Sequence, residues 1–427
     1  MTPSNNSDRI PASTRCFTVP QSGLLNVEAA REQLLAAVNP VTETALVPLE
    51  QALGRVLAST QLAPIAVPSV PNSAMDGYAL RAADTTGASP IRLPVQQRIA
   101  AGDVPAPLLP GTAARIFTGA ALPLGADAVV MQETTRLEAD TVLLEGPVAV
   151  GQFVRHPGED IPQGHALLTQ GTHLAPQHLG LAASVGLAAL PVFRPLRVAV
   201  VTTGSELVAP GQPLPPGKIY DANRYVLLAM LAQLHCQTRS VGTVHDDRQA
   251  ILEALEAAAH GADLVLTSGG VSVGEEDHVR AAVETLGELS LWRIAMKPGK
   301  PLAFGRIGTT PFLGLPGNPV SAFVTFCLFA RPLIMHLQGG VAAEPHPVWV
   351  GADFEWKKPG PRREFLRARR MHDGQGGERA VIYPNQSSGV LSSVTWAEGV
   401  VCVPEGQTVA RGDRVAFLPF TELGVCG

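Results

Sequence analysis

The feature that most limits the fold of this chain is an alternation of short β-branched runs with helical stretches between Leu196 and Leu337. Such an order is typical of βαβ units, in which helices cross over a mostly parallel sheet. The segment is therefore expected to form an α/β domain. The expected strands are Arg197–Val201, Thr238–Val244 and Asp263–Thr267, and the expected helices are Asn223–Leu234, Asp247–Ala259 and Asp277–Leu286.

The rest of the chain follows other patterns. Apolar residues recur with a helical period over Asn26–Val38 and over Leu49–Leu57. Repeated prolines divide residues 59–148 into short alternating pieces, which predicts a small β-rich module. Beyond Gly339-Gly340 a final β domain without helices is expected, with strands at Val348–Phe354, Glu364–Arg370, Val381–Tyr383, Gly399–Val403 and Arg414–Phe417.

Composition excludes several classes of protein. With 427 residues the chain is too long for one compact core, and its 46% hydrophobic and 16% charged residues are those of a globular protein. The 32 Lys and Arg against 37 Asp and Glu give a net charge of -5, so no overall positive field attracts a phosphate polymer. A nucleic-acid partner is therefore not expected.

Cysteines and apolar stretches indicate the compartment. The five cysteines are scattered and form no C-x-x-C pair, which argues against a disulfide framework and a zinc site. Residues 1–20 are expected to be a flexible tail without a signal peptide. Leu179–Phe193 is too short for a membrane span and Arg331-Pro332 interrupts Pro319–Leu337. Both stretches are expected to be buried in a cytoplasmic protein that has no membrane partner.

Five unusual loops follow the strands of the α/β segment. In an open sheet of this class, ligands bind beyond the carboxyl ends of the strands, where backbone N–H groups are free. Each loop alone could be an ordinary turn between packed elements, because Gly and Pro are common turn residues. Together they predict a site. The loops are Thr202–Glu206, His245–Asp247, Thr267–Gly274, Met296–Pro301 and Gly314–Pro319.

The loop residues indicate the class of ligand. Glycines let the backbone approach a ligand, and neighbouring hydroxyl and amide groups can bind phosphate oxygens. Lys297 and Lys300 flank a Pro-Gly pair and supply positive charge. The chain has neither G-x-x-x-x-G-K-[ST] nor G-x-G-x-x-G, so ATP hydrolysis and hydride transfer are not indicated. A small anion with phosphate or pyrophosphate is the expected ligand.

Eight further runs carry a resemblance to a known family. In chain order they are NSAMDGYAL (Asn72–Leu80), RIFTGAALPLGADAVVMQE (Arg115–Glu133), GEDI (Gly158–Ile161), TTGSEL (Thr202–Leu207), IYDANRYVLLAML (Ile219–Leu231), TSGGVSVGEEDHV (Thr267–Val279), MKPGKPLAFG (Met296–Gly305) and GLPGNPVSAF (Gly314–Phe323). With REFLRA (Arg363–Ala368) and QSSGVLSS (Gln386–Ser393) they resemble the MoeA family of molybdopterin molybdenumtransferases, which is related to the gephyrin E domain. The resemblance extends over nearly the whole chain after Gly23.

The resemblance implies a multidomain α/β plus β fold. Its central part would be a three-layer α/β molybdopterin-binding domain over residues 191–339, and residues 340–427 would form a C-terminal β domain. Residues 21–58 and 149–190 would form one discontinuous, extended N-terminal linker domain, into which the β-rich module of residues 59–148 is inserted.

The resemblance also implies an activity. The enzyme would insert molybdate into adenylylated molybdopterin, cleave the pyrophosphate link with Mg²⁺ and release AMP. It would be a homodimer, with an upstream adenylylating enzyme and downstream molybdoenzymes or chaperones as possible partners.

On this reading the substrate is held by the loops and by the C-terminal domain. Ser205 stands where the family often has Asp, so the role of a charge there is open. The expected substrate-binding residues are Thr118, Thr203, Gly204, Ser205, Ser268, Gly269, Gly270, Ser272, Pro298, Gly299, Pro316, Gly317, Asn318, Pro319, Ser321, Arg363, Arg367, Ser387 and Ser388.

Carboxylates and lysines are the expected catalytic groups. Asp277 and Asp246 are oxygen donors suited to a magnesium ion that keeps some waters, although either could instead stabilise a helix N-terminus. Family members carry Lys or Arg where this chain has Arg293. The whole expected catalytic set is Asp76, Asp160, Glu206, Asp246, Asp277, Lys297 and Lys300.

Simpler explanations stay open for several of these residues. Glu206 could be a first-turn helix acid, and Asp76 and Asp160 could be turn formers beside glycine. On the family reading, Asp76 and Asp160 would reach the site from the partner chain. The arginines of residues 362–370 could keep an edge strand soluble. As functions of another class, a molybdopterin-binding scaffold and a pyrophosphatase for another nucleotide conjugate also remain.

Overall fold

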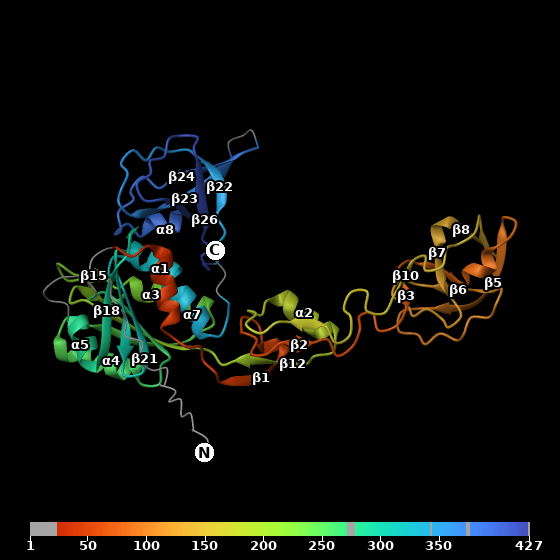
Figure 1. Ribbon diagram of the computed structural model, residues 1–427, viewed down its shortest axis with the longest axis horizontal. Coiled ribbons are helices and arrows are strands. Elements are labelled where there is room, and N and C mark those ends of the chain that lie inside the picture. Colours follow the sequence, from red (N-terminus) through yellow and green to blue (C-terminus); the bar gives the residue numbers. More distant parts are fainter. Residues whose placement is uncertain (1–23, 271–277, 342–343, 373–375, 426–427) are drawn as a thin grey trace, which may run out of the picture. The chain divides into compact units, whose positions relative to one another are not determined.

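The computed structural model describes residues 24–270, 278–341, 344–372 and 376–425, and it divides into two compact units. The larger unit contains residues 1–45, 54–58 and 192–427, and the smaller unit contains residues 46–53 and 59–191. Figure 1 labels some of the elements of both units. The predicted division into five segments is finer than these two units, and its boundaries stay predictions.

A six-stranded sheet forms the centre of the larger unit, in the order β16-β13-β17-β21-β20-β18. β16, β13, β17 and β21 run parallel, whereas β20 pairs antiparallel with both β21 and β18. The three predicted strands of the α/β segment are confirmed. The strand bounds are β13 (Arg197–Thr203), β16 (Gln237–Val244), β17 (Leu264–Ser268), β18 (Gly287–Arg293), β20 (Pro301–Ile307) and β21 (Thr310–Leu315).

Helices cover both faces of this sheet because its strands are apolar on both sides. Val198 and Val200 of β13 belong to one apolar cluster, and the intervening Ala199 and Val201 belong to another. The first cluster includes residues of α1 (Val27–Ala36), α3 (Asn223–Gln233), α6 (Pro319–Thr325) and α7 (Arg331–Leu337), and the second includes α4 (Arg248–Ala259) and α5 (His278–Leu286). The predicted three layers are therefore present.

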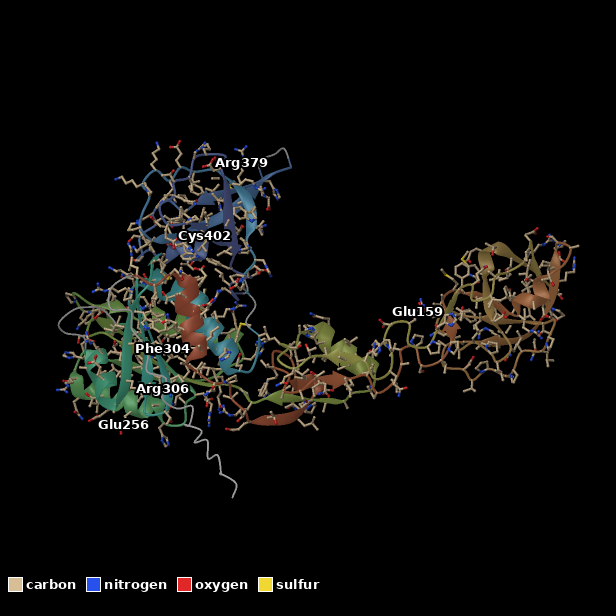
Figure 2. All side chains as sticks on the ribbon, viewed as in Figure 1. Glu159, Glu256, Phe304, Arg306, Arg379 and Cys402 are labelled. Carbon is tan, nitrogen blue, oxygen red and sulfur yellow. The ribbon has the colours of Figure 1, made fainter. Side chains whose placement is uncertain are left out.

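Helix α4 shows how the sequence positions these layers. Its buried residues Ile251, Leu255 and Ala258 recur every three or four positions and face the sheet. Glu256 lies on the exposed side, while Phe304 of β20 is fully buried (Figure 2). The helix begins after Asp247, whose carboxylate accepts a hydrogen bond from the Ala250 N–H at 2.8 Å.

The predicted burial of Pro319–Leu337 is confirmed. This stretch comprises α6, a π-helical turn over Phe326–Ala330 and α7. By length and composition alone its 19 residues could cross a membrane, but 89% of the apolar stretch is buried inside the fold. The helix is thus part of the core of the larger unit.

A second six-stranded sheet contains the C-terminal strands, in the order β19-β23-β24-β22-β26-β25, with β23 also paired to β25. β19 comes from the loop after β18, and it pairs in parallel with the start of β23. The expectation of no helix here is wrong, because α8 spans Ser392–Trp396. The strands are β19 (Met296–Lys297), β22 (Val348–Ala352), β23 (Arg363–His372), β24 (Glu378–Ile382), β25 (Gly399–Val403) and β26 (Arg414–Pro419).

The smaller unit is rich in strands, as predicted for residues 59–148. Its main sheet has the order β7-β4-β6-β5-β9-β8. These strands are β4 (Gly77–Leu80), β5 (Ile91–Ile99), β6 (Ala113–Ile116), β7 (Ala128–Met131), β8 (Thr135–Glu138) and β9 (Thr141–Leu144), with 3₁₀ turns at η2 (Ala82–Thr85) and η3 (Gln132–Thr134).

Short elements complete the described chain. The predicted helix over Leu49–Leu57 is wrong, because only the 3₁₀ turn η1 (Leu49–Gln51) forms before Gly54 takes a φ of 71°. The remaining elements are α2 (Pro176–Ser184), β1 (Thr44–Pro48), β2 (Gln61–Leu62), β3 (Asn72–Ser73), β10 (Val154–Arg155), β11 (Ala166–Leu168), β12 (Ala189–Phe193), β14 (Leu207–Val208) and β15 (Ile219–Tyr220).

The described cysteines carry no disulfide. Cys236, Cys327 and Cys402 are free, which agrees with the expected lack of a disulfide framework in this part of the chain. Burial raises the pKa of Cys236 and Cys327 to about 12 and that of Cys402 to about 11. These thiols are therefore protonated and unreactive at neutral pH.

Candidate functional site

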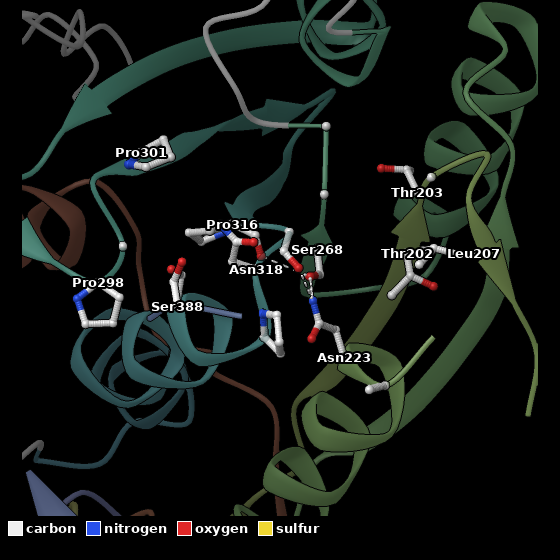
Figure 3. Close-up of a pocket in the computed structure, with 18 of the residues that line it drawn as sticks. Thr202, Thr203, Leu207, Asn223, Ser268, Pro298, Pro301, Pro316, Asn318 and Ser388 are labelled. Carbon is white, nitrogen blue, oxygen red and sulfur yellow. Dashed lines mark hydrogen bonds between the residues drawn. The ribbon is translucent and has the colours of Figure 1, made fainter. Parts of the chain in front are cut away.

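A cavity of about 940 Å³ lies in the larger unit, at the carboxyl ends of the parallel strands β13, β17 and β21. Figure 3 shows part of its lining. The predicted residues that line it are Thr203, Gly204, Glu206, Asp246, Ser268, Gly269, Gly270, Lys297, Pro298, Gly299, Lys300, Pro316, Gly317, Asn318, Pro319, Ser321, Ser387 and Ser388. The structure thus brings all five predicted loops to one hollow.

The glycine-rich loop after β17 needs its glycines. Gly269 has a φ of 95°, and a Cβ atom there would come within 2.5 Å of the Thr203 carbonyl oxygen. Gly270 has a φ of 64°, and its Cβ would come within 2.2 Å of the Val279 side chain. Any side chain would therefore push this loop away from the end of β13. The close approach leaves backbone on the cavity wall, where a ligand can reach it.

Asn223 ties two of the loops together. Its side-chain amide donates to the Ser268 hydroxyl at 2.9 Å and to the Gly317 carbonyl at 2.7 Å (Figure 3). The Ser268 hydroxyl donates in turn to the Pro316 carbonyl at 3.2 Å. The loops after β17 and β21 therefore hold fixed positions before any ligand binds.

Thr203 offers an unused hydroxyl. Its side chain lines the cavity and is 4% exposed, and its Oγ1 has no hydrogen-bond partner within the described ranges. A buried hydroxyl without a hydrogen-bond partner lowers the stability of the fold by about 1–3 kcal/mol. A ligand oxygen at this position would supply the missing hydrogen bond.

Acidic groups line the side of the cavity formed after β13 and β16. Asp246 is exposed, and its carboxylate accepts from the Ser205 N–H at 3.1 Å, while the Ser205 hydroxyl accepts from the Asp246 N–H at 3.1 Å. Glu206 lies on the same wall, with its carboxylate against Gly204. Ser205 thus does not line the cavity but fixes the loop that carries Asp246.

Asp221 is a second kind of carboxylate. It is 1% exposed and lines the cavity, yet it accepts hydrogen bonds from the hydroxyls of Thr202 at 2.5 Å and Thr243 at 2.9 Å and from the Arg224 N–H at 3.1 Å. These bonds occupy both of its oxygens. Asp221 therefore joins the ends of β13 and β16 to the start of α3.

Cationic side chains also line the cavity. Lys297 donates to Glu364 at 2.9 Å, and its ammonium lies 5.7 Å from the centre of the Trp356 ring. Glu364 is buried while Lys297 is half-exposed, so the buried carboxylate fixes an ammonium that still reaches the cavity. Lys300 is exposed and forms no ion pair with another described residue.

The C-terminal domain closes the cavity with the segment before α8. Ser388 accepts through its carbonyl from the Val320 N–H at 3.0 Å, which places Ser387 and Ser388 beside the N-terminus of α6. Behind them Arg367 is 1% exposed and donates to the Ser393 hydroxyl and the Ser387 carbonyl, both at 3.1 Å. Burial lowers the pKa of Arg367 to about 10. The arginine therefore supports this wall from inside.

Two predicted arginines do not line the cavity. Arg367 faces inward, as described, and Arg363 forms ion pairs with Glu28 and Glu405. The arginine of this strand region that does line the cavity is Arg362. Alternation along a strand could not distinguish them, because both faces of β23 are largely buried.

Other predicted residues lie elsewhere. Asp76 and Thr118 belong to the smaller unit, where the Asp76 carboxylate accepts from the Thr118 backbone N–H and hydroxyl, both at 2.8 Å. These bonds lower the pKa of Asp76. Asp160 also belongs to the smaller unit. Ser272 and Asp277 lie outside the described residues.

Several lining residues are absent from the predicted site set, among them the polar Asp221, Asn223, Arg362 and Gln386. The first two stand in the run IYDANRY, at the start of a predicted helix, where an acid and an amide are also ordinary capping residues. In the sequence, Arg362 could not be distinguished from the neighbouring arginines. Position at a strand end was the available signal for Asp221 and Asn223.

The described residues do not form a complete metal site by themselves. No group of three or more His, Cys, Asp or Glu side chains able to hold an ion occurs in the parts of the chain that the structure describes. Asp246 and Glu206 are nevertheless oxygen donors on one wall of the cavity. They fit a magnesium ion that takes its other ligands from water and phosphate.

Comparison with known proteins agrees with this architecture. Residues 25–186 match the MoeA N-terminal region (domain I and II), residues 199–336 match the probable molybdopterin binding domain, and residues 350–420 match the MoeA C-terminal region (domain IV).

Individual relatives match most of the chain. A molybdopterin molybdenumtransferase of Haemophilus influenzae is 39% identical over 404 residues, covering 94% of this chain and 100% of the relative. One of Bacillus subtilis is 35% identical over 376 residues, covering 85% and 86%. The solved molybdopterin biosynthesis MoeA protein of Pyrococcus horikoshii has a TM-score of 0.79 and 30% identity, covering 93% of this chain and 100% of that one. This chain therefore belongs to the MoeA family of molybdopterin molybdenumtransferases and is a transferase of molybdenum cofactor biosynthesis.

Proposed function

We propose that this protein inserts molybdate into adenylylated molybdopterin, with cleavage of the pyrophosphate link and release of AMP. The observation that carries the proposal is the 940 Å³ cavity, which the Gly269-Gly270 loop, Lys297 and Lys300 all line. A pyrophosphate needs N–H donors and fixed positive charge, and a molybdate dianion needs cationic neighbours as well. The names of the relatives support molybdopterin as the acceptor.

Each wall of the cavity has a role in this proposal. The glycine-rich loop and the Thr203 hydroxyl bind phosphate oxygens, while Lys297 and Lys300 offset the charge that develops as the pyrophosphate bond breaks. Ser387 and Ser388, supported by Arg367, offer hydroxyl groups to the molybdate oxygens. Asn223 keeps the loops in place, so little reorganisation is needed when the substrate binds.

Magnesium is the proposed metal, held by Asp246 and Glu206, with Asp277 as a further proposed ligand. When bound, it would polarise phosphate oxygens and stabilise the departing phosphate of AMP. Ser205 fixes the Asp246 carboxylate toward that position through its backbone N–H. Removal of the metal with a chelator should abolish AMP release and leave the fold intact.

The assembly and its surroundings belong to the same proposal. We infer a cytoplasmic homodimer in which Asp76, Thr118 and Asp160 of one copy serve the site of the other. An upstream enzyme that adenylylates molybdopterin would supply the substrate, and molybdoenzymes or their chaperones would receive the product.

The test is a turnover assay with the purified full-length chain. With Mg²⁺, molybdate and adenylylated molybdopterin, AMP should appear in a one-to-one ratio to cofactor formed. No AMP, with cofactor bound but unchanged, would identify a scaffold instead. AMP release without any need for molybdate, and from other nucleotide conjugates too, would identify a pyrophosphatase.

A further inference from the structure

A second cavity, of about 580 Å³, adjoins the first in the larger unit. It is lined by residues 355–362 together with Lys297 and Glu364, so Lys297 and Arg362 belong to both cavities. Its size falls within the range of about 300–1,000 Å³ that is usual for small-molecule sites. A ligand held at Lys297 in the first cavity could therefore extend into the second.

Trp356 gives this cavity a fixed aromatic wall. Its backbone exchanges hydrogen bonds with Val409, at 2.8 and 3.0 Å, and its indole packs against the apolar cluster of the C-terminal sheet. A ring held on one side by the core and facing a cavity on the other is suited to stacking with a planar ligand. The Lys297 ammonium, which lines both cavities, lies over this ring at 5.7 Å from its centre.

The charges around the indole favour an anionic ligand. Of the two acids that line the cavity, Glu355 pairs with Lys357 at 2.7 Å and Glu364 pairs with Lys297 at 2.9 Å. Lys358 forms no ion pair with any residue of the described ranges, and Arg362 donates only to the Met296 carbonyl at 3.3 Å among those ranges. Two positive charges therefore stay without a carboxylate.

The loop at residues 359–361, which also lines this cavity, has a restricted backbone. Pro359 and Pro361 flank Gly360, whose carbonyl accepts from the Gly406 N–H at 2.8 Å. A Cβ atom at Gly360 would lie 3.2 Å from the Glu364 carboxylate. A larger residue at this position would therefore press on the carboxylate that fixes Lys297.

We propose that this cavity, which we name the Trp356 cleft, binds a planar nitrogen heterocycle of the substrate by stacking on the indole, while the attached phosphate stays beside Lys297. The inference rests on the proposed function, since a conjugate of pterin and AMP has a heterocycle at each end of its pyrophosphate. A small oxyanion alone would use neither the indole nor the volume. The shared chemistry of the two ends is a flat ring carrying a phosphate.

Binding without turnover tests the cleft directly. The full-length protein is titrated with AMP and, separately, with 6-carboxypterin, and affinity is measured by calorimetry. Trp356→Leu should weaken binding of at least one probe by about ten-fold, as loss of one stacked ring does. Trp356→Phe should bind that probe within about three-fold of wild type, because a ring remains.

The control is Trp349→Leu, which removes an exposed tryptophan of β22 that lines neither cavity. It should leave both affinities unchanged. A second variant, Lys358→Glu, changes an exposed side chain and needs no repacking, so it reports on the cleft even where Trp356→Leu fails to fold. It should weaken the same probe several-fold.

The probe that responds identifies which end of the conjugate lies in the cleft. Equal affinities of wild type, Trp356→Leu and Lys358→Glu for both probes would overturn the proposal, as would failure of wild type to bind either probe. These results concern the ring alone, and AMP release in the turnover assay reports separately on the proposed function.

Discussion

At the scale of single residues, the lack of a side chain at Gly269 allows the glycine-rich loop to pack closely against Thr203. Gly269→Ala should lower the free energy of unfolding by about 1–3 kcal/mol, because a Cβ would meet the Thr203 carbonyl at 2.5 Å in a backbone region that disfavours side chains. The matched control is Gly317→Ala, whose Cβ would lie 3.6 Å from its nearest neighbour. Equal unfolding free energies for the two variants, measured by denaturant titration, would show that the close approach is not a constraint.

Asp263 links stability to pH through one ion-pair cluster. Burial alone would raise the pKa of its carboxyl, but hydrogen bonds from Arg194 and Arg197 outweigh burial and lower the pKa from 3.8 to about 2. A depressed folded-state pKa stabilises the protein fully above the unfolded value of 3.8, and this contribution is lost as the pH falls toward 2.

Asp263→Asn should therefore cost about 1–2 kcal/mol near neutral pH, after allowance for solvent screening. The difference in stability between the variant and the wild type should shrink below about pH 4. Thermal unfolding midpoints at pH 6 and pH 3 measure it. A difference that stays constant, or grows, at the lower pH would contradict the assigned ion pairs.

At the scale of elements, two adjacent aspartates are predicted to have different roles: Asp246 acts in catalysis and Asp247 caps α4. Asp247→Ala removes the cap of α4 and should cost about 1 kcal/mol of stability with activity retained. Asp246→Ala should leave stability nearly unchanged but reduce turnover by about a hundred-fold, as loss of a group that acts at the reacting charge does. Unfolding and AMP-release assays on both variants make the comparison. The reverse pattern would assign the functional role to Asp247.

Local periodicity explains which elements could be predicted. The strands β13, β16 and β17 and the helices α3 and α4 follow from β-branched runs and 3.6-residue patterns, which depend on neighbours in sequence. The pairing of β20 with β18 and β21, and the insertion of β19 beside β23, depend on contacts between distant segments. The secondary-structure propensity of a short stretch of sequence does not report which distant segments pair with it.

The residues of the site also divide into those that the local sequence predicted and those whose roles depend on the fold. All five loops were identified from glycine, proline and polar residues at strand ends. The pairing of Lys297 with Glu364, 67 positions apart, and the burial of Arg367 required the fold. In the sequence Arg362, Arg363 and Arg367 are equivalent cations, and the structure gives them three different surroundings.

At the scale of the whole molecule, the proposed dimer predicts complementation. A chain with Asp76→Ala and a chain with Lys297→Met should each be inactive alone. Random exchange of subunits makes half of the dimers mixed, and each mixed dimer has one intact shared site, so activity should recover to about a quarter of wild type. AMP release after co-expression measures this. No recovery in a mixture verified to contain mixed dimers would place all essential residues within one chain.

The most direct test of the central claim is a crystal structure of the full-length protein with AMP and molybdate bound. We predict that the phosphate lies against the Gly269-Gly270 loop and that molybdate lies within reach of Lys297 or Lys300, beside Ser387 and Ser388. Electron density for both anions outside the 940 Å³ cavity, with its loops empty, would contradict the account.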